Sequence, residues 1–372
     1  MSEDGLQLGR RQMLAAGFSA AALSVATSAV AQSTRRGSGA PARMPPIIDV
    51  HAHAILPSWY EWLARKNAPG PPRMEGIAVP QWSPELAIRV MDEHNIRCQI
   101  LSNSIGTKGM TAAEAVPLAR RMNEELAGFI ARHPGRFGAF AVIPVQDVEA
   151  SVREIAYALK TLHLDGVCLP TSHDGLYPGD PRFEPIWAEL DRQRAVAFVH
   201  PHAAPYTAGL KVGVVPGMVE FMFDSTRAVI SVVVSGTRRK YPNFKYIATH
   251  GGGTLPFIAE RAAYVTEQSA TYASMYTTKL SFDQVMEEFR SFHYDLAFAT
   301  SAPALAAIKA FVPVSQLLMG FDFPFVTQAT IAPAIDAVTA EGVFTNAELA
   351  AIATDNPLRL LPSLAARLSA RR

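Results

Sequence analysis

Two histidines follow the first apolar run of the chain at a spacing that suits a shared metal ion. His51 and His53 come directly after the run at 46–50. In a strand, residues two apart point to the same face, so both imidazoles can reach one cation. Imidazole nitrogen suits zinc, iron, copper or nickel better than calcium. The pair therefore predicts a metal site at the end of a strand.

Three more residues of metal-binding or proton-transferring type each follow a later apolar run. They are His200, His250 and Asp322. Five such residues at the ends of four predicted strands are hard to attribute to chance. Three neutral imidazoles and a carboxylate would hold one divalent ion and leave room for water. Such an ion would lower the pKa of bound water or polarise a substrate oxygen, and a further histidine beside it could move protons. We expect Zn²⁺, with Mn²⁺ as the alternative.

Short apolar runs alternate with amphipathic segments from residue 47 to the end of the chain, and this alternation would position the five residues. The predicted strands cover residues 47–50, 98–101, 138–143, 166–169, 196–199, 244–249, 292–296 and 317–320. The predicted helices include 112–131, 148–162, 183–194, 219–239 and 303–311. Eight such repeats predict an α/β fold, a distorted (β/α)8 TIM barrel over residues 47–372. A doubly wound sheet is the alternative, but it usually has a glycine-rich turn where this chain has His-Ala-His.

A long connection, residues 54–84, follows the first predicted strand. It contains Trp59, Tyr60, Trp62, Trp82 and several prolines. In a barrel it would lie over the mouth where active sites form, as a lid-like insertion. It could equally pack a small core of its own, and both can hold. If it is a lid, Trp59 would offer a flat apolar wall to a substrate.

The ordered motifs resemble those of the amidohydrolase superfamily (amidohydrolase 2 type), over residues 47 to about 362. The branch is the one that contains aminocarboxymuconate-semialdehyde decarboxylase, and the stretch 232–264 with 293–297 is most similar to its 6-methylsalicylate decarboxylase-like members. The matching motifs are His-X-His at 51–53, His-Pro at 200–201, His-X-Gly-Gly-X-X-Pro at 250–256 and Gly-X-Asp-X-Pro at 320–324. The resemblance implies that His51, His53, His200 and Asp322 bind the metal and that His250 is catalytic, with Asp322 assisting. It also implies a homodimer.

The chain differs from the usual superfamily motifs at two places, and these differences limit which members it resembles. Superfamily members with two metals usually carry a lysine on the fourth barrel strand, whereas this chain reads Gly-Val-Cys-Leu-Pro at 166–170. We therefore expect a single metal ion. Resorcylate decarboxylases usually have Glu-X-His on the first strand, where this chain has His-X-His.

Several other residues are candidates for substrate contact or for orienting a ligand. His173 lies in the loop after the fourth predicted strand, and His202 follows His200 by two residues. Arg227 and Arg261 lie on predicted helices, where either could face a carboxylate. Asp295 ends the seventh predicted strand and could orient a histidine ligand. For each of them a plain structural role is the alternative.

The constellation supports more than one function. The first hypothesis is non-oxidative decarboxylation of a small aromatic or unsaturated carboxylic acid by a carboxy-lyase. The second is a metal-dependent hydrolase of a lactone, ester or amide, because both reactions need a polarised oxygen and a mobile proton. A hydratase and a non-catalytic exported binding protein are smaller alternatives. The resemblance and the single metal favour decarboxylation.

The composition and the net charge indicate which kinds of partner and site to expect. The 372 residues are 49% hydrophobic and carry a net charge of +1. The charge gives no indication of a nucleic-acid partner. The two cysteines, Cys98 and Cys168, lie inside apolar runs without a Cys-X-X-Cys partner, so we expect small buried residues rather than a redox site.

The first 31 residues have the pattern of a twin-arginine signal peptide. Arg10 and Arg11 precede an apolar run that ends in Ala-Val-Ala at 29–31. A charged start, an apolar middle and a small-X-small exit favour a cleaved export signal over a mitochondrial presequence or a membrane anchor. Residues 32–46 would form a flexible linker. We therefore expect a periplasmic or exported protein with no stable membrane insertion after cleavage.

Overall fold

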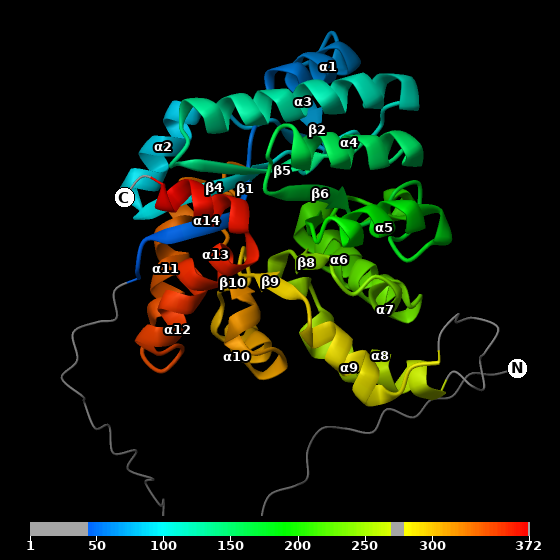
Figure 1. The fold of residues 1–372 in the computed structure, drawn as a ribbon, viewed down its shortest axis with the longest axis vertical. Helices are drawn as coiled ribbons and strands as arrows, with labels where there is room; N and C mark the ends of the chain where they lie inside the picture. Colours follow the sequence, from blue (N-terminus) through cyan, green and yellow to red (C-terminus); the bar gives the residue numbers. More distant parts are fainter. Residues whose placement is uncertain (1–43, 269–278, 371–372) are drawn as a thin grey trace, which may run out of the picture. The chain divides into compact units, whose positions relative to one another are not determined.

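Eight parallel strands form the central sheet in the computed structural model, which describes residues 44–268 and 279–370 (Figure 1). These residues belong to one compact unit. Neighbouring strands follow one another in chain order. They are β1 (Ile47–His53), β4 (Ile96–Ser102), β5 (Phe137–Val142), β6 (Gly166–Pro170), β7 (Val196–His200), β8 (Lys245–Ala248), β9 (His293–Asp295) and β10 (Leu317–Leu318). The predicted α/β barrel is confirmed, and each apolar run predicted to be a strand overlaps one.

The ring closes irregularly between β1 and the chain after β10. Val50 N donates to Met319 O at 2.9 Å, and His53 N donates to Phe323 O at 2.8 Å. Ala52 also forms an isolated parallel bridge with Phe323. The loop after the two-residue β10 therefore completes the barrel, so the barrel is distorted at this point.

Helices follow the strands and cover the barrel. They are α1 (Pro57–Asn67), α2 (Pro84–Glu93), α3 (Ala112–Arg132), α4 (Val148–Lys160), α5 (Glu184–Arg192), α6 (Pro216–Val234), α7 (Thr237–Lys240), α8 (Leu255–Gln268), α9 (Phe282–Arg290), α10 (Ala302–Phe311), α11 (Ile331–Thr339), α12 (Asn346–Ala350), α13 (Asn356–Leu360) and α14 (Pro362–Ser369). Short turns are η1 (Pro181–Phe183), η2 (Pro205–Gly209), η3 (His250–Gly252), η5 (Val314–Gln316), η6 (Gln328–Thr330) and the π-helical η7 (Ala351–Asp355). The single helix predicted at 219–239 is wrong: Gly236, with φ 79°, separates α6 from α7 because a left-handed residue ends a helix.

Two apolar clusters hold the barrel together. The inner cluster joins side chains such as Val50, Phe140 and Phe198 to leucines of α13 and α14. The larger cluster packs the other strand face against the surrounding helices. Cys98 and Cys168 are buried free thiols, as predicted. In the described ranges we find no helix with the length and apolar character needed to cross a bilayer.

The insertion after β1 both packs a core and reaches the barrel mouth. It contains α1 and a hairpin of β2 (Arg73–Met74) and β3 (Ile77–Ala78). Trp59 on α1 is 1% exposed and belongs to the larger apolar cluster. At the hairpin turn, Glu75 accepts from Ala203 N at 3.0 Å and pairs with Lys108. Because these partners lie after β7 and β4, the hairpin turn covers part of the carboxyl end of the barrel.

The predicted N-terminal segments lie mostly outside the described residues. The signal peptide at 1–31 and the linker up to residue 43 fall there. The predicted linker boundary at residue 46 is too late. Met44 is 6% exposed, and its carbonyl accepts from Asn95 Nδ2 at 3.2 Å, so the packed chain begins before β1.

Candidate metal centre

An irregularity in β1 turns its two histidines toward the barrel interior. Ile48 and Val50 belong to the inner apolar cluster, and the pairing register with β4 shifts between Asp49 and Ala52. Such a bulge interrupts the alternation of side chains along a strand. The His51 ring then packs edge-on against Phe198, an inner-cluster residue, at 4.9 Å between centroids.

Five side chains from distant parts of the sequence meet at the carboxyl end of the barrel. The ring centroid of His51 lies 5.1 Å from that of His53, 5.1 Å from that of His200 and 4.8 Å from that of His250. Ligand-type atoms of His51, His53, His200 and Asp322 all lie within 4.8 Å of one another. All five side chains belong to buried residues. The structure thus brings together the residues that the strand ends singled out.

Each of the four imidazoles is held through its Nδ1 atom. The partners are Asp295 Oδ2 for His51 (3.0 Å), Ser102 Oγ for His53 (2.8 Å), Pro201 O for His200 (2.9 Å) and Ala297 O for His250 (3.2 Å). All four partner atoms can accept a hydrogen bond, and Ser102 Oγ itself donates to Ala52 O. The arrangement favours the tautomer that carries hydrogen on Nδ1 and leaves a lone pair on Nε2.

The Nε2 atoms of the four histidines face one another, and no N–H or O–H group among the described residues donates a hydrogen bond to them. Those of His51, His200 and His250 are buried and have no hydrogen-bond partner among the described residues, although His51 Nε2 lies 3.5 Å from Asp322 Oδ1. The Nε2 of His53 lies 2.7 Å from Asp322 Oδ1. A lone pair that faces a carboxylate at this distance requires a proton or a cation, and unpaired buried nitrogens are costly. The donor set therefore fits a divalent metal ion.

Electrostatics at the cluster agree with a cation site. Burial, the largest influence, lowers the pKa of His51, but the carboxylates of Asp295 and Asp322 outweigh it and raise that pKa to about 10. Burial would raise the pKa of Asp322, yet His51 and His53 hold it well below its ordinary value. For His200 and His250, burial first and neighbouring histidines second lower the pKa. Two carboxylates thus attract one positive charge into a site whose other imidazoles stay neutral.

The backbone at two of these residues is in the left-handed region. His250 has φ 56° and Asp322 has φ 59°. This conformation is uncommon outside glycine and is concentrated at functional sites. Close approach also restricts Gly320, where an added Cβ would lie 2.6 Å from the Cβ of His51. The turns after β8 and β10 therefore fix His250 and Asp322 at a backbone cost.

Three phenylalanine rings lie close to imidazoles of the cluster. Phe325 lies 5.3 Å from the His53 ring, Phe221 lies 6.1 Å from the His200 ring, and Phe298 lies 6.5 Å from the His250 ring, between centroids. Phe298 is 67% exposed. Trp59, which the sequence predicted to form an apolar wall for a substrate, is buried in the larger apolar cluster.

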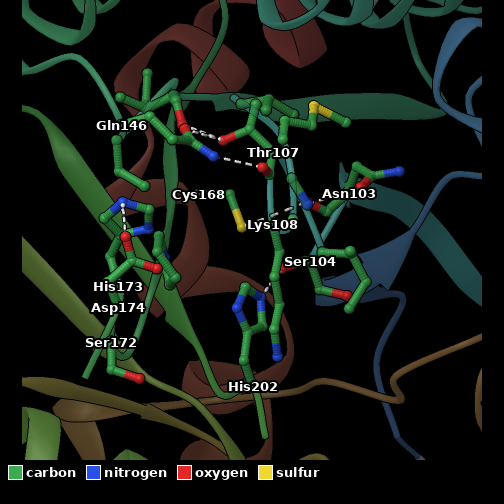
Figure 2. Close-up of a pocket in the computed structure, with 18 of the residues that line it drawn as sticks. Asn103, Ser104, Thr107, Lys108, Gln146, Cys168, Ser172, His173, Asp174 and His202 are labelled. Carbon is green, nitrogen blue, oxygen red and sulfur yellow. Dashed lines mark hydrogen bonds and ion pairs between the residues drawn. The ribbon is translucent and has the colours of Figure 1, made fainter. Parts of the chain in front are cut away.

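A cavity of about 130 Å³ lies beside the cluster, between the loops after β4, β5, β6 and β7 (Figure 2). His173 and His202, predicted to contact substrate, both line it. His202 is buried and its Nε2 contacts Ser104 O at 2.5 Å, whereas His173 is partly exposed. Cys168 also lines the cavity, and its thiol interacts with the hydroxyl of Ser102, the partner of His53. The cavity is therefore linked to His53 through Cys168 and Ser102.

The remaining candidates divide between the cluster and the surface. Asp295 is fully buried, holds His51 Nδ1, and accepts from His250 N at 3.0 Å. Arg227 is exposed on α6 and lies over the ring of Tyr206, 5.4 Å from its centroid. Arg261 is exposed on α8. Neither arginine lines the cavity.

Residues 48–363 match the sequence profile of the amidohydrolase family. The chain belongs to the amidohydrolase family. This amidohydrolase is 33% identical over 330 residues to the decarboxylase yanB of Aspergillus niger, which covers 85% of this chain and 87% of the relative. It is also 33% identical over 282 residues to the 6-methylsalicylic acid decarboxylase of Penicillium expansum, covering 74% and 84% of the two chains. The predicted branch of the superfamily is thereby confirmed.

Solved structures support the same fold for this amidohydrolase. A crystal structure described as an amidohydrolase II superposes with a TM-score of 0.77 at 25% identity and covers 85% of this chain and 99% of that one. The 5-carboxyvanillate decarboxylase of Sphingomonas paucimobilis superposes with a TM-score of 0.76 at 20% identity, covering 86% and 99%. At this identity the second likeness concerns the fold alone.

Sequence reasoning missed several residues of this site. Ser102 ends β4 and pairs in register with His53, so its position at a strand end was a usable signal. Phe325 lies in the same motif as Asp322, and Phe298 follows β9 closely. Phe221 had no local signal, because its place depends on how α6 packs over the barrel mouth.

Proposed function

We propose that the protein is a metal-dependent, non-oxidative decarboxylase of a small aromatic carboxylic acid. The observation that carries this proposal is the buried set of Nε2 atoms, held at Nδ1 and gathered around Asp322 near three phenylalanine rings. The relatives named as decarboxylases, at 33% identity over most of the chain, support this reaction over hydrolysis.

His51, His53, His200 and Asp322 would hold one divalent metal ion. We propose Zn²⁺, because three imidazoles and one carboxylate suit it; Mn²⁺ is the alternative, and solved decarboxylases of the same fold are described with bound manganese. The ion would supply Lewis-acid polarisation of a substrate oxygen. Asp295 and Ser102 would act one step further out, by orienting His51 and His53.

His250 is the proton carrier in this proposal. Its Nδ1 is occupied by Ala297 O and its Nε2 is free of protein partners, so Nε2 is the atom that can take and return a proton. Because burial lowers its pKa, the ring is neutral near pH 7 and able to accept. Decarboxylation breaks the bond between the ring carbon and the carboxyl carbon and releases carbon dioxide, and the ring carbon keeps the electron pair and takes one proton. That proton would come from solvent, His250 Nε2 would take it up, and the ionised Asp322, next to His53 and His51, would help pass it to the carbon.

The substrate in this proposal would lie at the metal centre, and the cavity next to it has the size of a single aromatic ring. A cavity of roughly 150 Å³ in another protein accommodates benzene. The cavity here is about 130 Å³, and its lining includes hydroxyl and amide side chains such as Ser172 and Gln146. A ring with one or two polar substituents would match this lining better than a long acyl chain.

A product assay tests the reaction class. The purified protein would be stripped of metal, reloaded with Zn²⁺ or Mn²⁺, and given 6-methylsalicylate, 2,6-dihydroxybenzoate and 5-carboxyvanillate beside aryl esters and lactones. We expect carbon dioxide from at least one hydroxybenzoate. Acid released from an ester or lactone, without carbon dioxide from any acid, would replace the decarboxylase by a hydrolase.

The role of His250 has its own test. In His250→Ala we expect metal content to stay near one ion per chain while turnover falls about a thousandfold, within the range for loss of a proton-transfer residue. His94, which follows α2 outside the cluster, provides the matched control His94→Ala. Near-normal turnover of His250→Ala would exclude this role.

We further propose export by the twin-arginine route. The support is the sequence of residues 1–31, with Arg10 and Arg11 before an apolar run. Mass spectrometry of the protein purified from a periplasmic fraction should find an N-terminus near Gln32. Arg10→Lys with Arg11→Lys should leave uncleaved protein in the cytoplasm, and export that persists in this double variant would argue against the route.

We also propose that the protein is a homodimer. Its support is a stretch of exposed apolar side chains: Tyr206, Leu210, Val212, Val214, Val215, Met218 and Phe223. A cluster of this kind marks an interaction surface more often than a free one. Light scattering should give about twice the chain mass, and Met218→Lys should lower it toward that of one chain. A wild-type protein of one chain mass would refute the dimer.

A further inference from the structure

A second cavity, of about 480 Å³, lies at the end of the barrel opposite to the histidines. Its lining comes from the starts of successive strands. Arg194 precedes β7 by two residues, Lys245 begins β8, His293 begins β9, and Ser315 precedes β10 by two residues. Arg359 on α13 completes the wall. In a parallel barrel the strand starts all lie at one end, away from the end where the reaction takes place.

The lining of this cavity carries three positive charges and no carboxylate. Among residues 44–268 and 279–370, the side chains of Arg194 and Lys245 have neither an ion pair nor a hydrogen bond. Arg359 donates to Ser315 O and to Asn356 Oδ1, both at 2.8 Å. These neutral acceptors hold the guanidinium in place without cancelling its charge. Surface arginines and lysines elsewhere on the barrel often have a carboxylate partner, as Arg136 does in Asp92.

A buried histidine adds an unused polar atom to the same wall. His293 is 9% exposed, and its Nδ1 is buried without a partner in the part of the chain that the structure describes. Burial first, and then Lys245, Arg359 and Arg238, lower its pKa to about 3, so the ring is neutral at pH 7. A neutral imidazole can donate one N–H to an anion, whereas a buried nitrogen without a partner destabilises the fold.

We propose that this cavity binds a phosphate group, either as inorganic phosphate or as a small phosphate ester. A doubly charged oxyanion would offset most of the positive charge, and its oxygens suit the planar guanidinium groups of Arg194 and Arg359. A monocarboxylate, such as a substrate of the proposed reaction, would leave two of the three charges uncompensated. The site is therefore distinct from the metal centre in both position and ligand chemistry.

Calorimetric titration of the full-length, metal-loaded protein tests this site. Inorganic phosphate, phenyl phosphate and acetate would be titrated separately. We expect phosphate to bind, and Arg194→Gln and Lys245→Met each to weaken it about tenfold, which is the usual effect of losing one charged hydrogen bond. Arg89→Gln on α2, an exposed arginine outside the cavity, is the matched control and should bind as the wild type does. The melting temperature of each variant should stay close to that of the wild type.

The other outcomes are equally informative. Tighter binding of phenyl phosphate would identify an ester as the ligand, and weaker binding would identify the free ion. Four results would overturn the proposal: no phosphate binding by the wild type, acetate binding as tightly as phosphate, unchanged phosphate binding in both variants, or loss of binding when the metal is removed from the wild type. The last result would place the phosphate at the histidine cluster.

Discussion

The two ends of the barrel are formed by the same strands, but their charged side chains differ in burial and in protein partners. At the carboxyl ends, His51 and Asp322 are 0% and 8% exposed, and each imidazole is fixed by a named partner. At the amino ends, Arg194 and Lys245 are exposed and free of protein partners in the described ranges. β9 joins both regions, since His293 lines the cationic cavity and Asp295 orients His51 two residues later. A buried, pre-oriented donor set suits tight metal binding and chemistry, whereas solvated cations suit a weaker, salt-dependent anion site.

The largest expected effect would come from removing the metal or one of its proposed ligands. Dialysis against a chelator, or His53→Ala, should lower turnover at least about a thousandfold, corresponding to about 4 kcal/mol of transition-state stabilisation. Activity of the dialysed wild type should return when the ion is added back. Arg194→Gln at the other end should change turnover no more than about twofold. Full activity in the metal-free protein would show that catalysis does not depend on a metal ion at the carboxyl end of the barrel.

A smaller effect is expected at Asp295, on the strand shared by both ends. In Asp295→Asn, the amide would present a donor or a weaker acceptor to His51 Nδ1, which disturbs the tautomer that frees Nε2. We expect metal affinity or turnover to fall by about 10-fold to 100-fold. Competition with a chromogenic chelator measures the affinity. The control is His293→Gln, two residues away on β9, in which both quantities should remain close to wild type.

The buried residue Asp49, two positions before His51, makes the stability of the folded protein depend on pH. It is fully buried, and burial raises its pKa to about 7, although hydrogen bonds from His51 N, Gln99 and Phe321 N act in the opposite direction. Because the unfolded chain releases this proton near its ordinary pKa of 3.8, the folded state binds more protons between about pH 4 and 7. The contribution of Asp49 to stability is therefore present at acidic pH and is lost as the pH rises through 7.

The variant Asp49→Asn should remove this pH dependence. Gln99 Oε1 has no partner among the described residues, so a rotated Gln99 amide can accept from the new Asn side chain. We expect a higher melting temperature than wild type at pH 8 and little gain at pH 5. Thermal unfolding at both values measures this, and an equal gain at both would show that ionisation of Asp49 is not the cause.

The smallest effect is expected at the cationic end without ligand. The double variant Arg194→Gln with Lys245→Met removes two neighbouring positive charges that repel each other. It should therefore raise the melting temperature by about 1 °C at low ionic strength. The rise should vanish in 0.5 M salt, where screening is strong, and kcat/KM should stay within about twofold. A lower melting temperature at low salt would show that the two cations stabilise the fold and are not held ready for an anion.

Much of the fold and of the centre could be predicted, and the misses have physical reasons. His51, His53, His200, His250 and Asp322 were recognisable because strand ends are visible as apolar runs. The break between α6 and α7 was missed because Gly236 is one residue within a long apolar pattern. Trp59 was assigned to a substrate wall from composition, but α1 packs it into the core. Asp295 was one candidate among several until its distance to His51 was known.

The sequence by itself determined the order of strands and helices, the residue types at the strand ends, and the family. It did so because strand periodicity and motif spacing are local properties of the chain. Only the tertiary structure decided which Nδ1 partner fixes each imidazole, where the three phenylalanine rings lie, and that three cations share one cavity. His53 and Asp322 are 269 residues apart, yet their side chains meet at 2.7 Å. Such contacts depend on barrel closure and on the β1 bulge, which no local pattern specifies.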